Sequence, residues 1–193
     1  MAFAGIVLAG GDARRLSGVD KPMLPVGGTT LLAKALGALA GARAVVVVGP
    51  ERTGLPELPA LTRVRERPAG SGPVAALAAG LAALPAVEVV VALAADLTGV
   101  SVSTVDKLRG ALASAGGADG AVLLDGGGHR QWLIGAWRTE SLRAALPADP
   151  IGASLRRTLG GLSLVEVGAE PGESGDVDTP ADLDRARRAA RGH

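Results

Sequence analysis

Short runs of apolar residues alternate with longer amphipathic stretches along the whole chain. Runs of about 4–8 apolar residues rich in Val are typical of strands that a parallel sheet buries on both faces. The amphipathic stretches between them are typical of helices that cover such a sheet. We therefore expect an α/β fold, a Rossmann-like three-layer sandwich whose mostly parallel sheet carries helices on both faces. Because neither a linker nor a repeat interrupts the pattern, residues 1–193 are expected to form a single domain.

The same pattern sets approximate bounds for each element. Strands are expected over Phe3–Ala9, Arg43–Gly49, Leu61–Glu66, Val87–Ala94, Ala118–Leu124, Gln131–Trp137 and Leu162–Val167. Helices are expected over Thr29–Leu39, Gly72–Leu84, Ser103–Ser114, Glu140–Leu146 and Ala153–Leu159. The sequence DGGGH between two of the strands predicts a hairpin turn. A last helix should begin at Thr179-Pro180, with Thr179 and Asp182 forming a capping-box pair.

Glycines and a carboxylate stand where expected strands end. Gly10 and Gly11 follow the first strand, and Asp96 follows the strongest apolar run of the chain. Ligands of open α/β sheets bind beyond the carboxyl ends of the strands, so we expect these residues to share a site. Glycines let a ligand approach the backbone closely, and a carboxylate is a hard oxygen ligand that suits Mg²⁺. The alternative is that Asp96 caps a helix or a turn.

The loop after the first strand has the chemistry of a polyphosphate site. Its sequence from Gly10 to Lys21, GGDARRLSGVDK, brings backbone N–H groups, two arginines and a lysine to one place. It is not a P-loop, because no Ser or Thr follows Lys21, and it is not a dinucleotide-binding turn, because Gly10 and Gly11 are adjacent. A surface turn with solvated charges is the alternative interpretation.

The sequence LAGGDARRLSGVDK resembles the signature of nucleotidyltransferases, and within them that of the molybdenum cofactor guanylyltransferases, the MobA-like family. The resemblance implies a fold like that of the nucleotide-diphospho-sugar transferases. It also implies a Mg²⁺-dependent reaction that transfers GMP from GTP to molybdenum-bound molybdopterin and releases pyrophosphate. The partners that it implies are GTP, a molybdopterin-type acceptor, and molybdoenzymes or their chaperones.

The resemblance also gives single residues expected roles. Arg15, Lys21 and Asp96 are the expected catalytic residues, with the two cations offsetting charge on the triphosphate. The nucleotide is expected to contact Leu8, Ala9, Gly10, Gly11, Arg15, Lys21, Glu66, Gly72, Pro73 and Asp96. The acceptor is expected at Gln131 and Trp132, whose ring could stack on a flat heterocycle. Asp96 and Asp178 are expected to hold the metal, which would place them near each other. The alternative is that Asp178 only begins the last helix, where a negative charge is favourable.

The chain departs from the family pattern at several positions. The family commonly has an Asp in its base-contacting loop, where this chain has Glu66 and Arg67, and a Pro after the metal-binding Asp, where this chain has Thr98. Asp178 stands where guanylyltransferases often carry Asn, and is closer to related cytidylyltransferases. Two alternatives therefore stay open. One is a cytidylyltransferase that uses CTP with molybdopterin or another small phosphorylated acceptor, and the other is a non-catalytic nucleotide- or cofactor-binding protein.

The composition of the chain mainly excludes certain kinds of site and partner. The chain has no cysteine, which excludes disulfides, thiolate metal sites and cysteine nucleophiles. Its net charge of +1 gives no reason to expect nucleic acid or a membrane surface as a partner. No apolar run approaches the roughly 18 residues that a membrane span needs, and we expect a cytoplasmic protein. Aromatic residues make up only 2% of the chain, so the core is expected to consist of Leu, Val and Ala.

Overall fold

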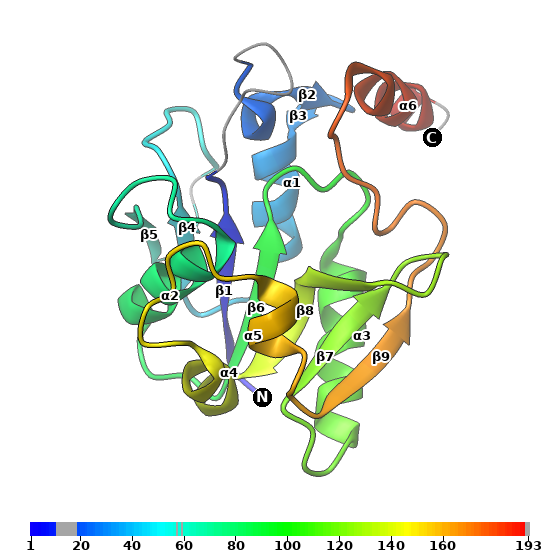
Figure 1. Ribbon diagram of the computed structural model, residues 1–193. Coiled ribbons are helices and arrows are strands. Elements are labelled where there is room, and N and C mark those ends of the chain that lie inside the picture. Colours follow the sequence, from blue (N-terminus) through cyan, green and yellow to red (C-terminus); the bar gives the residue numbers. More distant parts are fainter. Residues whose placement is uncertain (11–18, 57, 59, 192–193) are drawn as a thin grey trace.

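One sheet of seven strands runs through the computed structural model, in the order β5-β4-β1-β6-β8-β7-β9 (Figure 1). The structure describes residues 1–10, 19–56, 58 and 60–191. The strands of this sheet are β1 (Phe3–Leu8), β4 (Val45–Val48), β5 (Leu61–Val64), β6 (Val89–Ala94), β7 (Gly120–Leu124), β8 (Arg130–Arg138) and β9 (Leu164–Gly168). β8 runs antiparallel to β6 and β7, and the other neighbouring strands are parallel. The mostly parallel sheet expected from the sequence is therefore confirmed.

Helices cover both faces of the sheet, which confirms the three layers (Figure 1). One face carries α1 (Leu31–Ala38) and α3 (Val102–Ser114), and the other carries α2 (Pro73–Ala83), α4 (Thr139–Ala145) and α5 (Leu155–Leu159). Successive strand side chains point to opposite faces, so Ile6 packs under α2 while Val7 packs under α1 and α3. The contact with α2 is close, since a Cβ atom at Gly80 would lie 2.8 Å from Ile6 Cγ2.

The core is mostly aliphatic, and Phe3 and Trp137 are its buried aromatic residues. Trp137 is fully buried on the α2 face of the sheet. Two glycines, Gly120 and Gly135, make room for its ring, because a Cβ atom at either position would come within 3.0 Å of ring atoms. The expectation of a core built only from Leu, Val and Ala is wrong at this position. The indole fits because the residues beside it on β7 and β8 are glycines.

A small layer lies above the carboxyl ends of the strands. It contains the 3-10 helix η2 (Lys21–Met23), a two-stranded sheet of β2 (Pro25–Val26) and β3 (Thr29–Thr30), and α6 (Pro180–Arg191). A cluster of Val26, Leu31 and Val177 joins α6 to this sheet (Figure 1). The helix expected from Thr29 begins at Leu31 instead, because Thr29 pairs with Val26 and Thr30 caps the helix by accepting a hydrogen bond from the Ala33 N–H at 3.1 Å.

The other expected elements are present, with bounds that differ by a few residues. The DGGGH turn is confirmed, since the Asp125 N–H donates to the His129 carbonyl at 3.0 Å. The capping box of the last helix is also confirmed. Asp182 accepts a hydrogen bond from the Thr179 N–H at 2.6 Å, and Thr179 accepts one from the Asp182 N–H at 3.3 Å. Of the helices in the described part of the chain, none has the length and apolarity needed to cross a bilayer.

Candidate active site

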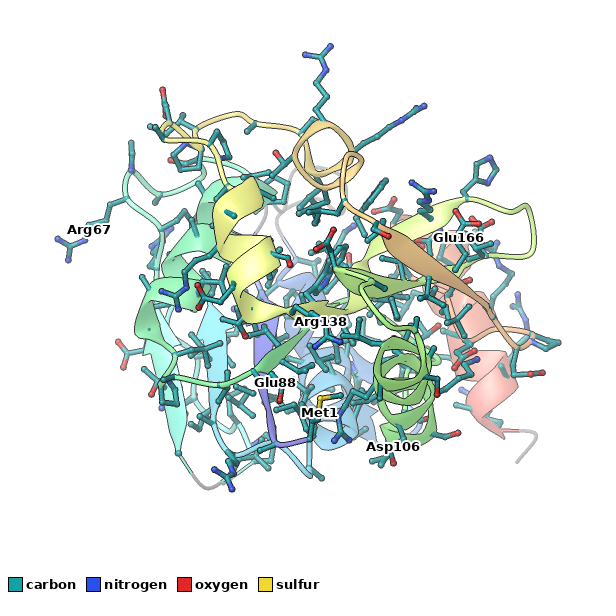
Figure 2. All side chains as sticks on the ribbon, turned by 90° about the horizontal axis from the view of Figure 1, so that it is seen from below. Met1, Arg67, Glu88, Asp106, Arg138 and Glu166 are labelled. Carbon is teal, nitrogen blue, oxygen red and sulfur yellow. The ribbon has the colours of Figure 1, made fainter. Side chains whose placement is uncertain are left out.

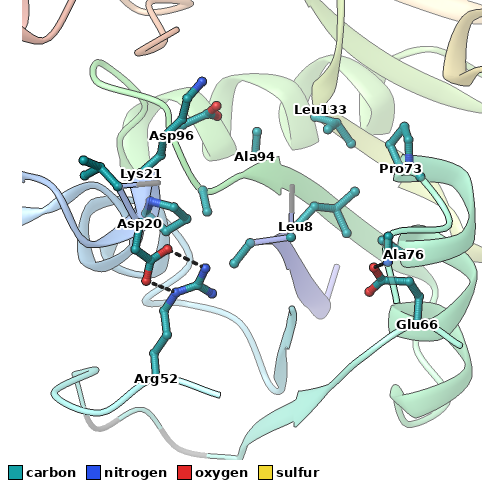
Figure 3. A pocket seen from close by; sticks show the side chains of 17 residues that line it. Leu8, Asp20, Lys21, Arg52, Glu66, Pro73, Ala76, Ala94, Asp96 and Leu133 are labelled. Carbon is teal, nitrogen blue, oxygen red and sulfur yellow. Dashed lines mark hydrogen bonds and ion pairs between the residues drawn. The ribbon is translucent and has the colours of Figure 1, made fainter. Parts of the chain in front are cut away.

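A cleft of about 390 Å³ opens at the carboxyl ends of β1 and β6 (Figure 3). Most of the nucleotide-binding residues expected from the sequence line it: Leu8, Ala9, Gly10, Lys21, Glu66, Gly72, Pro73 and Asp96. Gly11 and Arg15 lie outside the described residues. The sequence therefore identified where the cleft forms, and the contacts that these residues make with a ligand remain a prediction.

The floor of the cleft is the end of β1, held by backbone contacts on both sides. The Ala9 N–H donates to the Val48 carbonyl at 2.8 Å, and the Ala95 N–H donates to the Leu8 carbonyl at 3.0 Å. Gly49 lies so close to β1 that a Cβ atom there would come within 2.7 Å of the Ala9 carbonyl group. Only glycine fits this approach, and its place directly after an apolar strand is a signal that the sequence analysis missed.

Lys21 is mostly buried, although the sequence indicated an exposed loop cation. Its side chain is 15% exposed, and its Nζ donates to Asp178 Oδ1 at 2.7 Å. The partner comes from the segment just before α6, which folds back over the carboxyl ends of the strands (Figure 1). The fold thus delivers a cation to one wall of the cleft and places a carboxylate beside it.

Three carboxylates, those of Asp96, Asp176 and Asp178, influence one another electrostatically near Lys21. Burial raises the pKa of Asp96, and the nearby Asp176 and Asp178 carboxylates raise it further, whereas Lys21 opposes the shift. Desolvation and the Asp178 carboxylate also raise the pKa of Asp176. Like charges that repel at one place favour the protonated form unless a cation joins them. Asp178 contributes to the raised pKa of Asp96, while the shared metal site of Asp96 and Asp178 remains a prediction. Asp176 is a third acidic group that the sequence analysis did not select.

A short backbone pairing fixes the segment that carries Asp176 and Asp178, here called the acidic segment, against the end of β6. Leu97 forms an antiparallel bridge with Asp176. The Thr98 N–H and hydroxyl both donate to the Gly175 carbonyl, at 2.8 Å and 3.0 Å. The departure of Thr98 from the family's Pro is thereby explained, because a proline has no N–H to donate to this pairing.

Glu66 lies on the opposite wall of the cleft from Lys21 and Asp96 (Figure 3). It is 7% exposed, and its Oε1 accepts a hydrogen bond from the Gly70 N–H at 2.9 Å. Its Oε2 is buried and has no hydrogen-bond partner among the residues described. A buried carboxylate oxygen without a donor is costly, and a ligand that supplies N–H or O–H groups at this wall would remove that cost.

Arg52 and Asp20 form a fork at the mouth of the cleft (Figure 3). Arg52 Nε donates to Asp20 Oδ2 and Arg52 Nη2 donates to Asp20 Oδ1, both at 2.8 Å. Neither residue was selected from the sequence. Their pairing spans distant parts of the chain, and no local motif signals it.

Residues 5–166 match the profile of the MobA-like NTP transferase domain. The chain belongs to this family. The transferase is 30% identical to the molybdenum cofactor guanylyltransferase of Rhodobacter capsulatus, an alignment that covers 99% of this chain and 98% of that protein. It is 35% identical to the molybdenum cofactor guanylyltransferase of Bradyrhizobium sp. (strain ORS 278), over 78% of this chain and 74% of that protein. It is thus a nucleotidyltransferase.

Solved structures share the transferase's fold. The molybdopterin-guanine dinucleotide biosynthesis protein A from Archaeoglobus fulgidus superposes with a TM-score of 0.70 at 19% identity, over 98% of this chain and 100% of that chain. The 2-C-methyl-D-erythritol 4-phosphate cytidylyltransferase from Thermus thermophilus superposes with a TM-score of 0.71 at 22% identity, over 99% of this chain and 100% of that chain. The nucleotide-diphospho-sugar transferase architecture expected from the sequence is confirmed.

The acidic wall of the transferase fits a divalent cation in part. Within the described ranges, no three His, Cys, Asp or Glu side chains are grouped so that they could hold a metal by themselves. Mg²⁺ in nucleotide enzymes takes one or two carboxylates and completes its shell with phosphate oxygens and water. Asp96 and Asp178, whose charges repel, would be the carboxylates of such a partial shell, and the cation would relieve that repulsion.

The two residues expected to bind the acceptor are absent from the cleft lining described. The Gln131 side-chain N–H donates to Asp125 Oδ2 at 2.9 Å, and the Trp132 ring packs on the α2-side core with the Arg130 guanidinium 5.7 Å from the ring centroid. Leu133 reaches the cleft instead. The acceptor role of Gln131 and Trp132 remains a prediction, and Leu133 is the residue of β8 that a bound ligand would meet first.

Proposed function

We propose that the transferase moves GMP from GTP to a molybdopterin-type acceptor and releases pyrophosphate, in the biosynthesis of the guanine dinucleotide form of the molybdenum cofactor. The names of the relatives from Rhodobacter capsulatus and Bradyrhizobium support the acceptor class. In the reaction, a phosphate oxygen of the acceptor forms a bond to the α-phosphorus of GTP, and the bond between the α-phosphorus and the bridging oxygen of pyrophosphate breaks. No covalent enzyme intermediate is needed, because positioning and charge neutralisation carry such transfers.

The two walls of the cleft suit the two ends of a nucleoside triphosphate. The wall of Lys21 and Asp96 supplies a cation and a carboxylate for the phosphate end. Lys21 would offset charge on the triphosphate as pyrophosphate leaves. A magnesium ion held by Asp96 and Asp178 would supply further positive charge there when bound. The opposite wall, with Glu66, would receive the base (Figure 3).

Glu66 carries the choice of guanine. Guanine presents two adjacent donors on one edge, N1–H and the N2 amino group, and an ionised carboxylate is an acceptor. The buried, unpartnered Oε2 of Glu66 would accept from this edge. Cytosine and adenine present only an amino donor beside a ring acceptor, which would face the carboxylate with repulsion. A site built on a polar contact rejects a ligand that leaves it unpaired.

Competition titrations with GTP, CTP, ATP and UTP in Mg²⁺ test this assignment. We expect GTP to bind most tightly. Glu66→Gln should weaken GTP binding by about tenfold or more while leaving CTP binding nearly unchanged, because the amide N–H₂ would face the guanine donors once its oxygen accepts from the Gly70 N–H. Glu140→Gln, an exposed change on α4, is the matched control.

The outcomes separate the candidate functions. Preference for CTP would favour a cytidylyltransferase, the interpretation that Asp178 supports. Binding of no triphosphate would contradict nucleotide chemistry in this cleft. Tight GTP binding without pyrophosphate release in the presence of molybdenum-loaded molybdopterin would favour a non-catalytic binding protein.

A further inference from the structure

One short segment touches both ends of the loop that carries the family signature. The segment is Gly49–Arg52, which follows β4. At the start of the loop, the Gly49 backbone packs against the backbone of Ala9 and Gly10, where a Cβ atom would come within 2.7 Å and 3.0 Å. At the end of the loop, Arg52 binds Asp20, the residue before Lys21. The same four residues therefore set where the loop leaves the sheet and where it returns.

The Arg52–Asp20 pair has the geometry of a clamp. Two guanidinium nitrogens each donate to a separate carboxylate oxygen at 2.8 Å, the planar arrangement that gives arginine its geometric specificity. The Arg52 side chain is 7% exposed, so its orientation is fixed by packing, whereas the Asp20 side chain is 47% exposed. The buried partner thus holds the exposed one.

The hydrogen bonds of Arg52 distinguish two roles that a cleft arginine could have. Nε and Nη2 donate to Asp20, and Nη1 donates to the Pro50 carbonyl at 3.4 Å. Three of the five guanidinium N–H groups therefore have acceptors, and Asp20 offsets the charge. A positioning role uses the fork as it stands, whereas a direct role would place the other two N–H groups on the triphosphate.

We propose that Arg52 is a positioning residue that acts through Asp20 to place Lys21 for charge stabilisation, an inference that rests on the proposed function. Asp20 and Lys21 are consecutive, but they bind different segments. Asp20 binds Arg52 in the segment after β4, and Lys21 binds Asp178 in the segment before α6. Fixing Asp20 removes the freedom of the backbone that carries the lysine. A displacement of about 1 Å at a catalytic group can cost on the order of a hundredfold in rate.

Two double-mutant cycles test the clamp, with pyrophosphate release from GTP in Mg²⁺ and molybdenum-loaded molybdopterin as the readout. The first cycle combines Asp20→Asn with Arg52→Gln. The second combines Arg52→Gln with Lys21→Met. Arg109→Gln is the matched control, because Arg109 also pairs with a carboxylate, that of Asp106, and donates to the Met1 carbonyl beside the amino end of β1, away from the cleft at its carboxyl end. Asp106 and Met1 are labelled in Figure 2.

We expect Asp20→Asn and Arg52→Gln each to lower kcat by about tenfold to a hundredfold, with little change in KM. The double variant should be no slower than either single variant. In the Lys21→Met background, Arg52→Gln should have no further effect, because the residue that it positions is gone. The charge-swapped variant, Asp20→Arg with Arg52→Asp, should recover part of the lost rate, which a general loss of folding would not allow.

Several results would overturn the clamp. If Asp20→Asn leaves kcat unchanged while Arg52→Gln lowers it, Arg52 acts on the substrate directly. If the losses from Arg52→Gln and Lys21→Met multiply, the two residues act independently. If the wild-type protein turns over and the Asp20 and Arg52 variants have the same kcat, only the clamp is contradicted. If the wild-type protein releases no pyrophosphate from any triphosphate, the proposed function is contradicted.

Discussion

Lys21 differs from an ordinary surface lysine because the fold buries its stem and pairs its charge. Its Nζ lies 2.7 Å from Asp178 Oδ1, and the side chain is only 15% exposed. The same wall holds Asp96, whose pKa burial and neighbouring carboxylates raise. A triphosphate with its metal would bring negative charge to the lysine and positive charge to the acids. We therefore expect substitutions of single residues in this wall to change activity and stability to different extents.

Lys21→Met should lower the rate of pyrophosphate release by about 10²–10³, the cost of losing one donor that stabilises transition-state charge. The free energy of unfolding should fall by only about 1 kcal/mol, because Asp178 is half-exposed and water replaces much of the lost pairing. Turnover assays and denaturant titrations on the same preparation measure both quantities. An unchanged rate in the folded variant would remove Lys21 from the site.

Asp96→Asn should make the ligand-free protein more stable at neutral pH. The pKa of Asp96 is raised in the folded state, so the ionised side chain weakens the fold above the ordinary Asp range near 3.9. As the pH falls through the raised pKa, wild-type Asp96 takes up a proton, and the difference in stability between Asp96→Asn and the wild type should disappear. Thermal melts from pH 7 to pH 3, with the exposed Asp184→Asn as control, would reveal this trend. A destabilised Asp96→Asn at pH 7 would contradict it.

At the scale of elements, the acidic segment before α6 is held in place by α3. Lys107 on α3 donates to Glu173 Oε2 at 2.7 Å, and the Glu170 N–H donates to the same oxygen at 2.8 Å. Gly99 packs against the same segment so closely that a Cβ atom there would overlap the Gly172 carbonyl. Together with the Thr98 pairing, these contacts fix where Asp176 and Asp178 stand relative to β6.

Glu173→Gln should therefore reduce stability in a pH-dependent way. Burial alone would raise the pKa of Glu173, but hydrogen bonds from Lys107, Thr104 and the Glu170 N–H outweigh it and lower the pKa. The stabilisation is thus fully present above the ordinary Glu pKa of about 4.3 and is lost as the pH falls through the lowered value.

Denaturant titrations at pH 7 should show a loss of about 1–2 kcal/mol for Glu173→Gln. The difference in the free energy of unfolding between Glu173→Gln and the wild type should narrow below about pH 4. Glu140→Gln, on the exposed face of α4, should show no such gap at either pH. A gap for Glu173→Gln that stays constant with pH would mean that packing, and not charge, ties the segment to α3.

The sequence predicted the helices and strands better than the side-chain pairs that form between them. Alternating apolar runs identify β1, β4 and β6, and the residues directly after them, Gly10 and Asp96, follow from the rule that ligands bind at strand ends. Asp20 and Arg52 could not be found in this way. Their pairing depends on how two loops meet, and neither loop carries a periodic pattern. Asp176 lies two residues before Asp178, but only the folded segment shows that its charge acts on Asp96.

For the whole molecule, the three-layer sandwich was predictable, because a buried parallel sheet needs helices on both faces. The small layer of η2, β2, β3 and α6 was not, since its strands are only two residues long and its cluster joins Val26, Leu31 and Val177 from distant parts of the chain. This layer nevertheless brings Lys21 and Asp178 together over the cleft. The wall that we propose to be catalytic thus depends on the part of the fold that local sequence patterns describe least.

The most direct test of the account is steady-state pyrophosphate release by the purified wild-type protein, supplied with GTP, Mg²⁺ and molybdenum-loaded molybdopterin. We expect release that requires all three components and yields the guanine dinucleotide product in equal amount. We also expect Asp96→Asn to abolish this release while remaining folded. Release that proceeds equally with CTP would contradict the role of Glu66, and no release with any triphosphate would contradict the account as a whole.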